Sequence, residues 1–402
     1  MVKEAQMKKT EIGLIPEDWE VVKLGEIANI VSGGTPSTFN PSYWNGNIDW
    51  FTPTEVGYSK YLYASRRKIS SLGFKNASAN LLPKNSILLT TRAGIGDLGI
   101  LKIEACTNQG FQSIVVKENI PFEFIYYLMS TQKEQLLKNA SGSTFLEISP
   151  NKIKNLQIPL PPLAEQEAIA AALSDCDAWI ENLESVITKK RLIKQGAMQE
   201  LLTPKVNWEV KKLGEVAHFR RGSFPQPYGL DKWYDDINGM PFIQVFDVAK
   251  NRRLKLDTKR KISEAAQFMS VFVPKNTIVL TIQGSIGRIA LTQYDAYCDR
   301  TLLIFERINS DIDQFFFLLS VEQIFEIEKE KAPGGTIKTI TKEALSDFKF
   351  VYPKSLSEQT RIATVLSDMD AELEALGQKL NKARQIKQGM MQELLTGRVR
   401  LV

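Results

Sequence analysis

The chain contains two copies of one sequence unit, and this internal repeat limits the folds that it can adopt. Three pairs of segments show the match: DWEVVKLGEIA (18–28) with NWEVKKLGEVA (207–217), LPKNSILLTTRAGIGDLGI (82–100) with VPKNTIVLTIQGSIGRIAL (273–291), and IKQGAMQELLTPKV (193–206) with IKQGMMQELLTGRV (386–399). Matches at a nearly constant offset along the whole chain predict two domains of the same fold.

The glycine run GIGDLG at Gly94–Gly99 has the spacing of a dinucleotide-binding fingerprint. Such a fingerprint needs a helix that opens at the glycines, because the pyrophosphate binds at the helix N-terminus. In the second copy Ser285 and Ala290 replace the outer glycines, and only the middle one, Gly96 or Gly287, is shared. We therefore interpret each run as a turn between two strands. A nucleotide-dependent enzyme that uses Gly94–Gly99 remains an alternative.

Each copy has a helical pattern, at 121–140 and 311–332, and then closes with a much longer one in which apolar residues are spaced 4-3-4-3-4, as in a coiled-coil seam. The predicted seam consists of Ile169, Leu173, Cys176, Ile180, Leu183 and Ile187 in the first long helix and of Ile362, Leu366, Met369, Leu373, Leu376 and Leu380 in the second. Pro161-Pro162 and the capping-box pair Ser355 and Glu358 mark the two starts. Each helix should have about 40 residues and be ~60 Å long.

Compact domains of about 150 residues cannot easily carry the chain back along ~60 Å, so we expect the two helices to pair antiparallel within one chain. Heptads alone would also suit a homodimer. Gly196 and Gly389 lie inside the helices, where they would permit a close approach. The predicted fold is α+β: two pseudo-two-fold related α/β domains joined by two long antiparallel helices that form a coiled coil. We divide the chain into a first domain (1–157), a first long helix (158–203), a second domain (204–352), and a second long helix with a C-terminal tail (353–402).

Composition argues against an enzyme and a membrane protein. Of the 402 residues 43% are hydrophobic, yet no run approaches the ~18 apolar residues of a membrane span, so we expect a cytoplasmic protein. Cys106, Cys176 and Cys298 match no metal-ligand spacing, and the single histidine, His218, lacks the context of a catalytic triad. We therefore predict no catalytic residue, no metal site and no cofactor in this chain.

Basic residues with neighbouring aromatic residues favour DNA as a partner, and the net charge of +5 permits it. The candidate DNA-binding residues are Arg66, Arg67, Lys68, Arg92, Arg220, Arg221, Arg252, Arg253, Lys259, Arg260 and Lys261. The framework segments of the two copies match, whereas the segments 35–51 and 223–243 hardly do. This contrast is expected if one scaffold presents two different reading surfaces.

Three segments resemble the specificity subunits of type I restriction-modification systems: GLIPEDWEVVKLGEI (13–27), IPLPPLAEQEAIAAALSDCDAWI (158–180) and VYPKSLSEQTRIATVLSDMDAEL (351–373). The resemblance implies two target recognition domains, each reading one half of a bipartite, asymmetric site in double-stranded DNA. It implies that the long helices set the spacing and dock two modification (methyltransferase) subunits, which the restriction subunits join. S-adenosylmethionine, ATP and Mg would then belong to those partners.

A partner surface is also expected on the first long helix. Trp179 and Val186 lie off its seam, where the second helix has Glu372 and Lys379, and an apolar residue outside a two-helix seam suggests a further contact. A coiled-coil scaffold without DNA binding is the remaining alternative.

Overall fold

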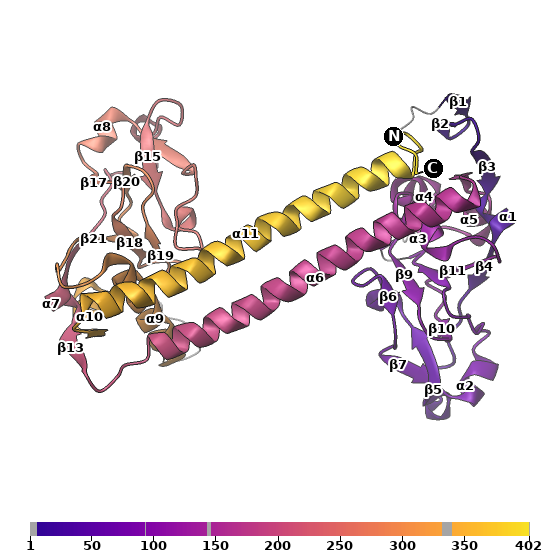
Figure 1. The fold of residues 1–402 in the computed structure, drawn as a ribbon, viewed down its shortest axis with the longest axis horizontal. Helices are drawn as coiled ribbons and strands as arrows, with labels where there is room; N and C mark the ends of the chain where they lie inside the picture. Colours follow the sequence, from indigo (N-terminus) through magenta and orange to yellow (C-terminus); the bar gives the residue numbers. More distant parts are fainter. Residues whose placement is uncertain (1–5, 93, 143–145, 332–339, 402) are drawn as a thin grey trace. The chain divides into compact units, whose positions relative to one another are not determined.

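The computed structural model describes residues 6–92, 94–142, 146–331 and 340–401 (Figure 1). The chain forms two compact units: unit 1 consists of Met1–Ser185 with Gln378–Val402, and unit 2 of Val186–Gly377. The division passes through both long helices, α6 (Leu163–Leu201) and α11 (Leu356–Leu394), so each unit contains one globular domain and a segment of each helix. No helix within the described ranges is both long enough and apolar enough to cross a membrane.

The globular domain of unit 1 contains two main sheets. The sheet with strand order β4-β11-β8-β9-β6 is called the helix-side sheet, and the sheet with order β10-β5-β7 is called the outer sheet. Their strands are β4 (Ala28–Ser32), β5 (Trp44–Phe51), β6 (Tyr61–Leu62), β7 (Arg67–Ile69), β8 (Ile87–Leu89), β9 (Leu98–Leu101), β10 (Ala105–Thr107) and β11 (Gln112–Val116). Two further antiparallel pairs are β1 (Met7–Thr10) with β2 (Gly13–Pro16), and β3 (Glu20–Lys23) with β12 (Gln157–Leu160). The short helices are α1 (Leu24–Ile27), α2 (Ser71–Asn76), α3 (Phe122–Ser130), α4 (Lys133–Asn139) and α5 (Pro150–Lys154), with 3-10 turns η1 (Pro41–Tyr43) and η2 (Pro53–Glu55).

Unit 2 repeats this plan. Its helix-side sheet has the order β14-β21-β18-β19, and its outer sheet has the order β16-β15-β20-β17. The strands are β14 (Ala217–Arg221), β15 (Met240–Ile243), β16 (Arg260–Ile262), β17 (Val271–Val273), β18 (Ile278–Thr281), β19 (Ile289–Leu291), β20 (Ala296–Cys298) and β21 (Leu302–Ile308), and β13 (Trp208–Lys212) pairs with β22 (Lys349–Pro353). The helices are α7 (Leu213–Val216), α8 (Glu264–Gln267), α9 (Gln314–Lys331) and α10 (Lys342–Ser346), with turns η3 (Asp231–Trp233) and η4 (Val245–Asp247). Each outer sheet contains one parallel pair, β5 with β10 and β15 with β20, so the predicted doubling of the fold is confirmed.

Both glycine runs form tight turns between antiparallel strands, β8 with β9 and β18 with β19. In the first turn the Thr90 hydroxyl donates to the carbonyl of Gly94 at 2.6 Å, and Gly96 has a φ of +93°. In the second, Gly287 has a φ of +84°, and a Cβ there would lie 2.8 Å from Phe325. Glycine is needed because it alone adopts this conformation without strain. No helix opens at either run among the described residues, so the turn interpretation holds and the helix that a dinucleotide-binding fingerprint needs is not formed there.

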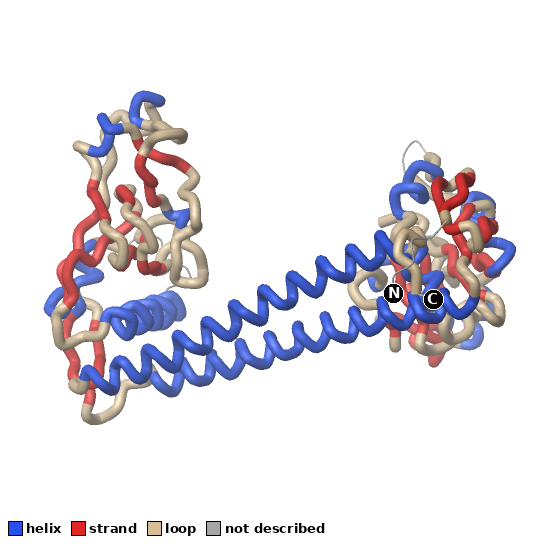
Figure 2. The backbone as a smooth tube through the Cα atoms, turned by 45° about the horizontal axis from the view of Figure 1, so that its top comes forward, coloured by secondary structure: helices blue, strands red, loops and turns tan. Residues whose placement is uncertain are grey.

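The two long helices have 39 residues each and run antiparallel in each unit (Figure 2). In unit 1 Asp177 pairs with Lys387 at 2.5 Å and Glu184 with Arg384 at 2.6 Å. A residue further along α6 thus pairs with a residue earlier in α11, as antiparallel helices require. In unit 2, Lys190 pairs with Glu372 at 2.7 Å in the same sense.

The helix ends follow the local sequence signals, except at residues 158–160. Helix α6 begins after Pro162, and the Ser355 hydroxyl accepts the amide of Glu358 at 3.4 Å at the start of α11. Residues 158–160, which we assigned to the long helix, instead belong to β12, because they complete the pair with β3. A Cβ at Gly196 or Gly389 would meet nothing within 4 Å, so these glycines do not mark a close approach.

The long helices share the main core of each unit with the helix-side sheet. The predicted seam residues Ile169 and Leu173 belong to the main core of unit 1, and Ile362 and Leu366 belong to that of unit 2. The other seam residues are buried (Cys176, Ile187) or half-buried (Ile180, Leu183, Met369, Leu373, Leu376, Leu380). The outer sheets have separate cores, built in unit 1 around Trp50, Ile69 and Cys106 and in unit 2 around Phe224, Trp233 and Phe242. Each domain therefore consists of a part that holds the helices and an outer part that does not.

Candidate nucleic-acid interface

The outer sheet of each domain carries the same basic strand at its edge. Strand β7 is Arg67-Lys68-Ile69 and strand β16 is Arg260-Lys261-Ile262, and each pairs antiparallel with the central strand β5 or β15. The isoleucine of each strand is fully buried, and the basic residues that precede it are exposed or half-buried. The sequence identifies both basic clusters, and the fold places them at equivalent edges of the two outer sheets.

The residue before each basic strand is held by the same kind of contact in both domains. The backbone amide of Arg66 donates to the Glu55 carboxylate at 2.6 Å, and the amide of Lys259 donates to the Asp247 carboxylate at 3.0 Å. Each carboxylate also accepts the amide that caps its own 3-10 turn, at 2.8 and 2.9 Å. Burial raises the pKa of Asp247. The two basic strands are thus fixed in the same way although the capping residues differ.

A hydroxyl group beside each basic strand makes the same two hydrogen bonds in both domains. Ser65 donates to the carbonyl of Arg67 at 2.6 Å, and Thr258 donates to the carbonyl of Arg260 at 2.7 Å. The same hydroxyls accept an amide from the neighbouring strand, at 2.9 Å from Trp50 and 3.3 Å from Phe242. The register of each basic strand is therefore set by side chains as well as by the sheet.

Each strand also stacks an arginine on an aromatic ring. The guanidinium carbon of Arg67 lies 3.8 Å from the centre of the Trp44 ring, and that of Arg260 lies 3.7 Å from the Tyr234 ring. Stacking uses the face of the planar guanidinium and leaves the N–H donors at its edge for another partner. The two rings come from the segments 35–51 and 223–243, which otherwise differ between the copies.

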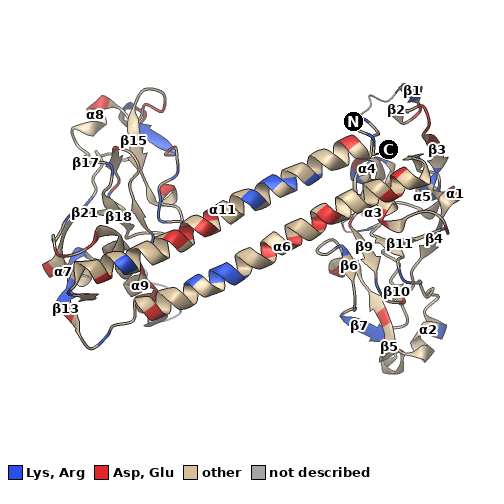
Figure 3. Ribbon diagram, in the orientation of Figure 1, with Lys and Arg blue, Asp and Glu red and all other residues tan. Residues whose placement is uncertain are grey.

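Figure 3 shows where Lys and Arg lie along the ribbon. The candidate cations differ in the carboxylates that they meet. Lys68 pairs with Asp49 at 3.1 Å, Arg92 with Glu147 at 2.9 Å, and Arg260 with Asp236 at 3.1 Å, while Arg220 and His218 share Glu306 at 3.7 and 3.0 Å. Arg66, Arg67, Arg221, Arg253, Lys259 and Lys261 have no carboxylate within ion-pair distance among the residues that the structure describes. Surface pairs of this kind are weak, so the paired cations can still exchange partners.

Arg252 was expected among the DNA-binding cations, but the structure places it in the interior of unit 2. Its side chain is 10% exposed and lies between Glu322 of α9, at 2.6 Å, and Asp370 of α11, at 2.5 Å. Both carboxylates neutralise the guanidinium and shield it from solvent. We therefore assign Arg252 to the attachment of the domain to the helices and remove it from the candidate interface.

The corresponding attachment in unit 1 uses different side chains around an equivalent aspartate. Lys60 donates to the Tyr127 hydroxyl at 2.6 Å and to Ser174 at 3.0 Å, and it lies 3.6 Å from Asp177. Burial lowers the pKa of Lys60. Lys387 reaches the same aspartate from α11.

Asp177 and Asp370 occupy matching places in LSDCD and LSDMD, and the lysines that meet them across the helices, Lys387 and Lys194, match as well. Each of these aspartates receives one cation from the globular domain and one from the other helix. The repeat was the signal that could have found them.

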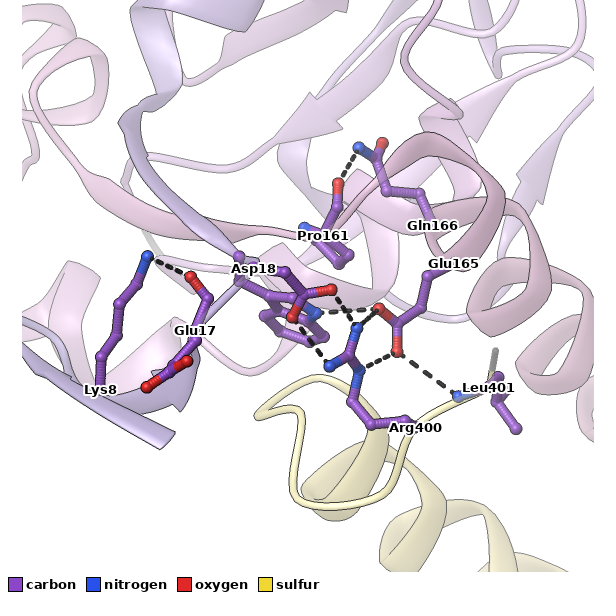
Figure 4. A network of polar contacts seen from close by, with 9 residues as sticks. Lys8, Glu17, Asp18, Pro161, Glu165, Gln166, Arg400 and Leu401 are labelled. Carbon is purple, nitrogen blue, oxygen red and sulfur yellow. Dashed lines mark hydrogen bonds and ion pairs between the residues drawn. The ribbon is translucent and has the colours of Figure 1, made fainter. Parts of the chain in front are cut away.

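The C-terminal tail closes unit 1 through a buried ion pair (Figure 4). Arg400 donates to Glu165 at 2.7 Å and to Asp18 at 2.7 and 2.9 Å, and the Trp19 indole donates to Glu165 at 2.9 Å. The hydrogen bonds with Glu165 and Asp18 raise the pKa of Arg400, and the bond from Arg400 lowers the pKa of Asp18. The C-terminal tail, which belongs to the second sequence copy, therefore packs on the globular domain of the first copy.

The segments that differ between the copies carry exposed apolar residues. Phe39 is 96% exposed in the first segment, and Ile237 is 83% exposed in the second. On α6, Trp179 is 44% exposed and Val186 is half-buried.

All three cysteines are free and buried, and burial raises the pKa of the Cys106 thiol to about 11.

Comparison with known proteins gives a consistent result. The family profile for the type I restriction modification DNA specificity domain matches residues 16–191 and 205–385. The MjaIX specificity subunit of Methanocaldococcus jannaschii is 36% identical over 270 residues, which are 61% of this chain and 62% of that subunit, so that match spans less than two thirds of the relative. The MjaVIII specificity subunit of the same organism is 26% identical over 99% of this chain and 97% of its own length.

Solved structures share the fold at low sequence identity. The S subunit of a type I restriction-modification system from M. genitalium has a TM-score of 0.60 and 17% identity, and the match covers 98% of this chain and 99% of that one. The HsdS subunit of Thermoanaerobacter tengcongensis has a TM-score of 0.50 and 20% identity, with 96% and 98% covered. The chain therefore belongs to the type I restriction-modification specificity subunits, the non-catalytic DNA specificity component of these systems, and it carries two target recognition domains.

Proposed function

We propose that each target recognition domain reads one half of a bipartite, asymmetric DNA site. The observation that carries this proposal is the contrast between the two domains: their sheets, turns and basic strands are equivalent, whereas the segments 35–51 and 223–243 differ in sequence. Phosphate contacts position a protein on DNA, and contacts to base edges give specificity. Two unlike reading segments on one scaffold fit two unlike half-sites.

The proposed DNA-binding residues are the predicted cations without Arg252: Arg66, Arg67, Lys68, Arg92, Arg220, Arg221, Arg253, Lys259, Arg260 and Lys261. We assign the long helices the role of a spacer, whose length sets the number of unread base pairs between the half-sites. Two modification subunits dock on the helices and the restriction subunits join them, and S-adenosylmethionine, ATP and Mg bind to these partners. The exposed Trp179 beside Val186 supports a protein contact on α6.

A segment exchange tests the reading of half-sites. The chain is expressed with its modification subunits, and methylated adenines are mapped across a genome. Replacing 35–51 together with 65–70 by the segments of a relative should change one half-site and leave the other and the spacer unchanged. The matched exchange of 223–243 should change only the other half-site. An exchange that altered both half-sites, or neither, would contradict the proposal.

A helix insertion tests the spacer. Seven residues added to both α6 and α11 keep the seam in register and lengthen each helix by about 10 Å, so the spacer should grow by up to roughly 3 bp. Both half-sites should persist. An unchanged spacer together with altered half-site bases would show that the helices do not set the distance.

The docking surface can be tested separately. Trp179→Ala should weaken co-purification with the modification subunits without changing the melting temperature, because it removes an exposed aromatic anchor. Asn182→Ala, at an exposed position of the same helix, serves as the control. Equal recovery of the modification subunits with both variants would exclude Trp179 from the contact.

A further inference from the structure

We infer that the basic segments Arg66–Lys68 and Lys259–Lys261 contact DNA phosphates and read no base. This inference rests on the proposed function and divides its DNA-binding residues into two classes. The basic segments supply affinity that does not depend on sequence, and the segments 35–51 and 223–243 supply base recognition.

Equivalence between the domains is the first argument. The two segments occupy the same edge strand, and matching carboxylates and hydroxyls hold their backbones in the same way. The residues that distinguish two unlike half-sites must themselves differ between the two domains. Phosphates are the same at every base pair, so a phosphate contact can be kept unchanged in both domains.

The second argument concerns the partners of the arginine side chains in the two basic segments. The stacked Arg67 keeps its N–H edge free, and Arg66 and Arg67 have no carboxylate partner among the described residues. Arg260 is stacked in the same manner but pairs with Asp236. A planar guanidinium held on a ring loses little freedom when it binds a phosphate through two hydrogen bonds. Arg260 must first give up its carboxylate, so Arg67 should contribute more than Arg260.

The position of the strands is the third argument. Both lie in the outer sheets, whose cores contain no residue of the long helices. The basic face is therefore not used to hold the domain on the helices. Cations on an edge strand can also serve only to prevent pairing with another chain, and that role would not depend on DNA.

Salt dependence separates these roles. The wild-type complex with modification subunits is first used to map the methylated site, and binding is then measured from 50 to 200 mM salt on a duplex with that site and on one of equal length without it. Each phosphate contact contributes about 0.9 to the slope of log K against log salt, which is about 3.5-fold over this range. Arg67→Gln should lower the slope by about 0.9. It should also weaken binding equally on the duplex with the site and on the duplex without it.

The matched control is Lys154→Gln, which removes one charge at an exposed position at the end of α5 and should leave the slope unchanged. Arg260→Gln should give a smaller change than Arg67→Gln. In the mapping experiment both half-sites should persist in both variants. An unchanged slope at an unchanged melting temperature would overturn the inference, and so would a changed base in either half-site.

The proposed function can fail independently. If the wild-type complex shows no bipartite site, that proposal falls, while the slope on the duplex without a site still tests the phosphate contacts. A normal site with no effect of Arg67→Gln would overturn this inference alone.

Discussion

Replacing Arg400 with methionine should destabilise unit 1 far more than a change two residues from the last position would suggest. The Arg400 side chain is 9% exposed and that of Glu165 is fully buried, whereas Asp18 is half exposed. Methionine keeps the apolar stem and removes the charge. Glu165 would then be a buried carboxylate whose remaining partners are the Trp19 indole and the amide of Leu401.

Removing one partner of a buried ion pair costs about 3–5 kcal/mol, and the exposed contact with Asp18 adds little. The Trp19 hydrogen bond remains, so we expect about 3 kcal/mol. Unit 1 has about 200 residues, for which 1 kcal/mol shifts the melting temperature by roughly 2–4 °C, so the unit 1 transition should fall by roughly 6–12 °C. The transition of unit 2 should not move.

Calorimetry and urea denaturation of the full chain can resolve the two transitions, and a matched control lies on the same tail. Arg398→Ala removes an exposed arginine that pairs with Glu393 at 3.8 Å, and it should cost no more than about 0.5 kcal/mol. Combining Arg400→Met with Glu165→Gln should recover part of the loss, because the buried charge is then removed as well. Equal effects of Arg400→Met and Arg398→Ala would refute the reasoning.

Three further predictions concern the Asp18 contact, two glycines and two neighbouring arginines. Because Arg400 lowers the pKa of Asp18 below its ordinary value of 3.8, the small contribution of this contact should be present above about pH 4 and lost at lower pH, so the stability difference between wild type and Asp18→Asn should shrink below about pH 4, as measured by urea titration. Gly287→Ala should lower the stability of unit 2 by about 1–3 kcal/mol because of its positive φ, whereas Gly196→Ala, in open space within α6, should stabilise by about 0.5–1 kcal/mol. Arg252→Gln should lower the melting temperature of unit 2 without changing the salt slope of DNA binding, and Arg253→Gln should do the reverse; a changed slope with Arg252→Gln would return that residue to the interface.

Local and repeated signals made most of the fold predictable. The heptad spacing with Pro161-Pro162 and Ser355 gave the long helices, because these signals act within a few residues of the helix ends. Comparison of the two copies identified the glycine turns, since a functional loop would have kept Gly94 and Gly99 in both. The strand β12 was assigned to the helix because its pairing with β3 is a contact between distant segments.

The candidate site was less predictable, because the role of a charged residue depends on partners far along the chain. Arg252 looks like any exposed basic residue until Glu322 and Asp370 are seen around it. The equivalence of the basic strands was visible in the repeated RKIS of 67–70 and 260–263, but its meaning depends on the carboxylates that hold each backbone.

The paired aspartates also restrict how such a chain could be reassembled from parts. Asp177 and Asp370 belong to the helices, whereas the cations that meet them, Lys60 and Arg252, belong to the globular domains. A domain grafted from another specificity subunit would have to bring a cation to the same place, or leave a partly buried carboxylate short of a partner. Lysine and arginine differ in length and shape. An exchanged recognition domain is therefore compatible with the helices only if one of its side chains supplies the cation that meets the helix aspartate.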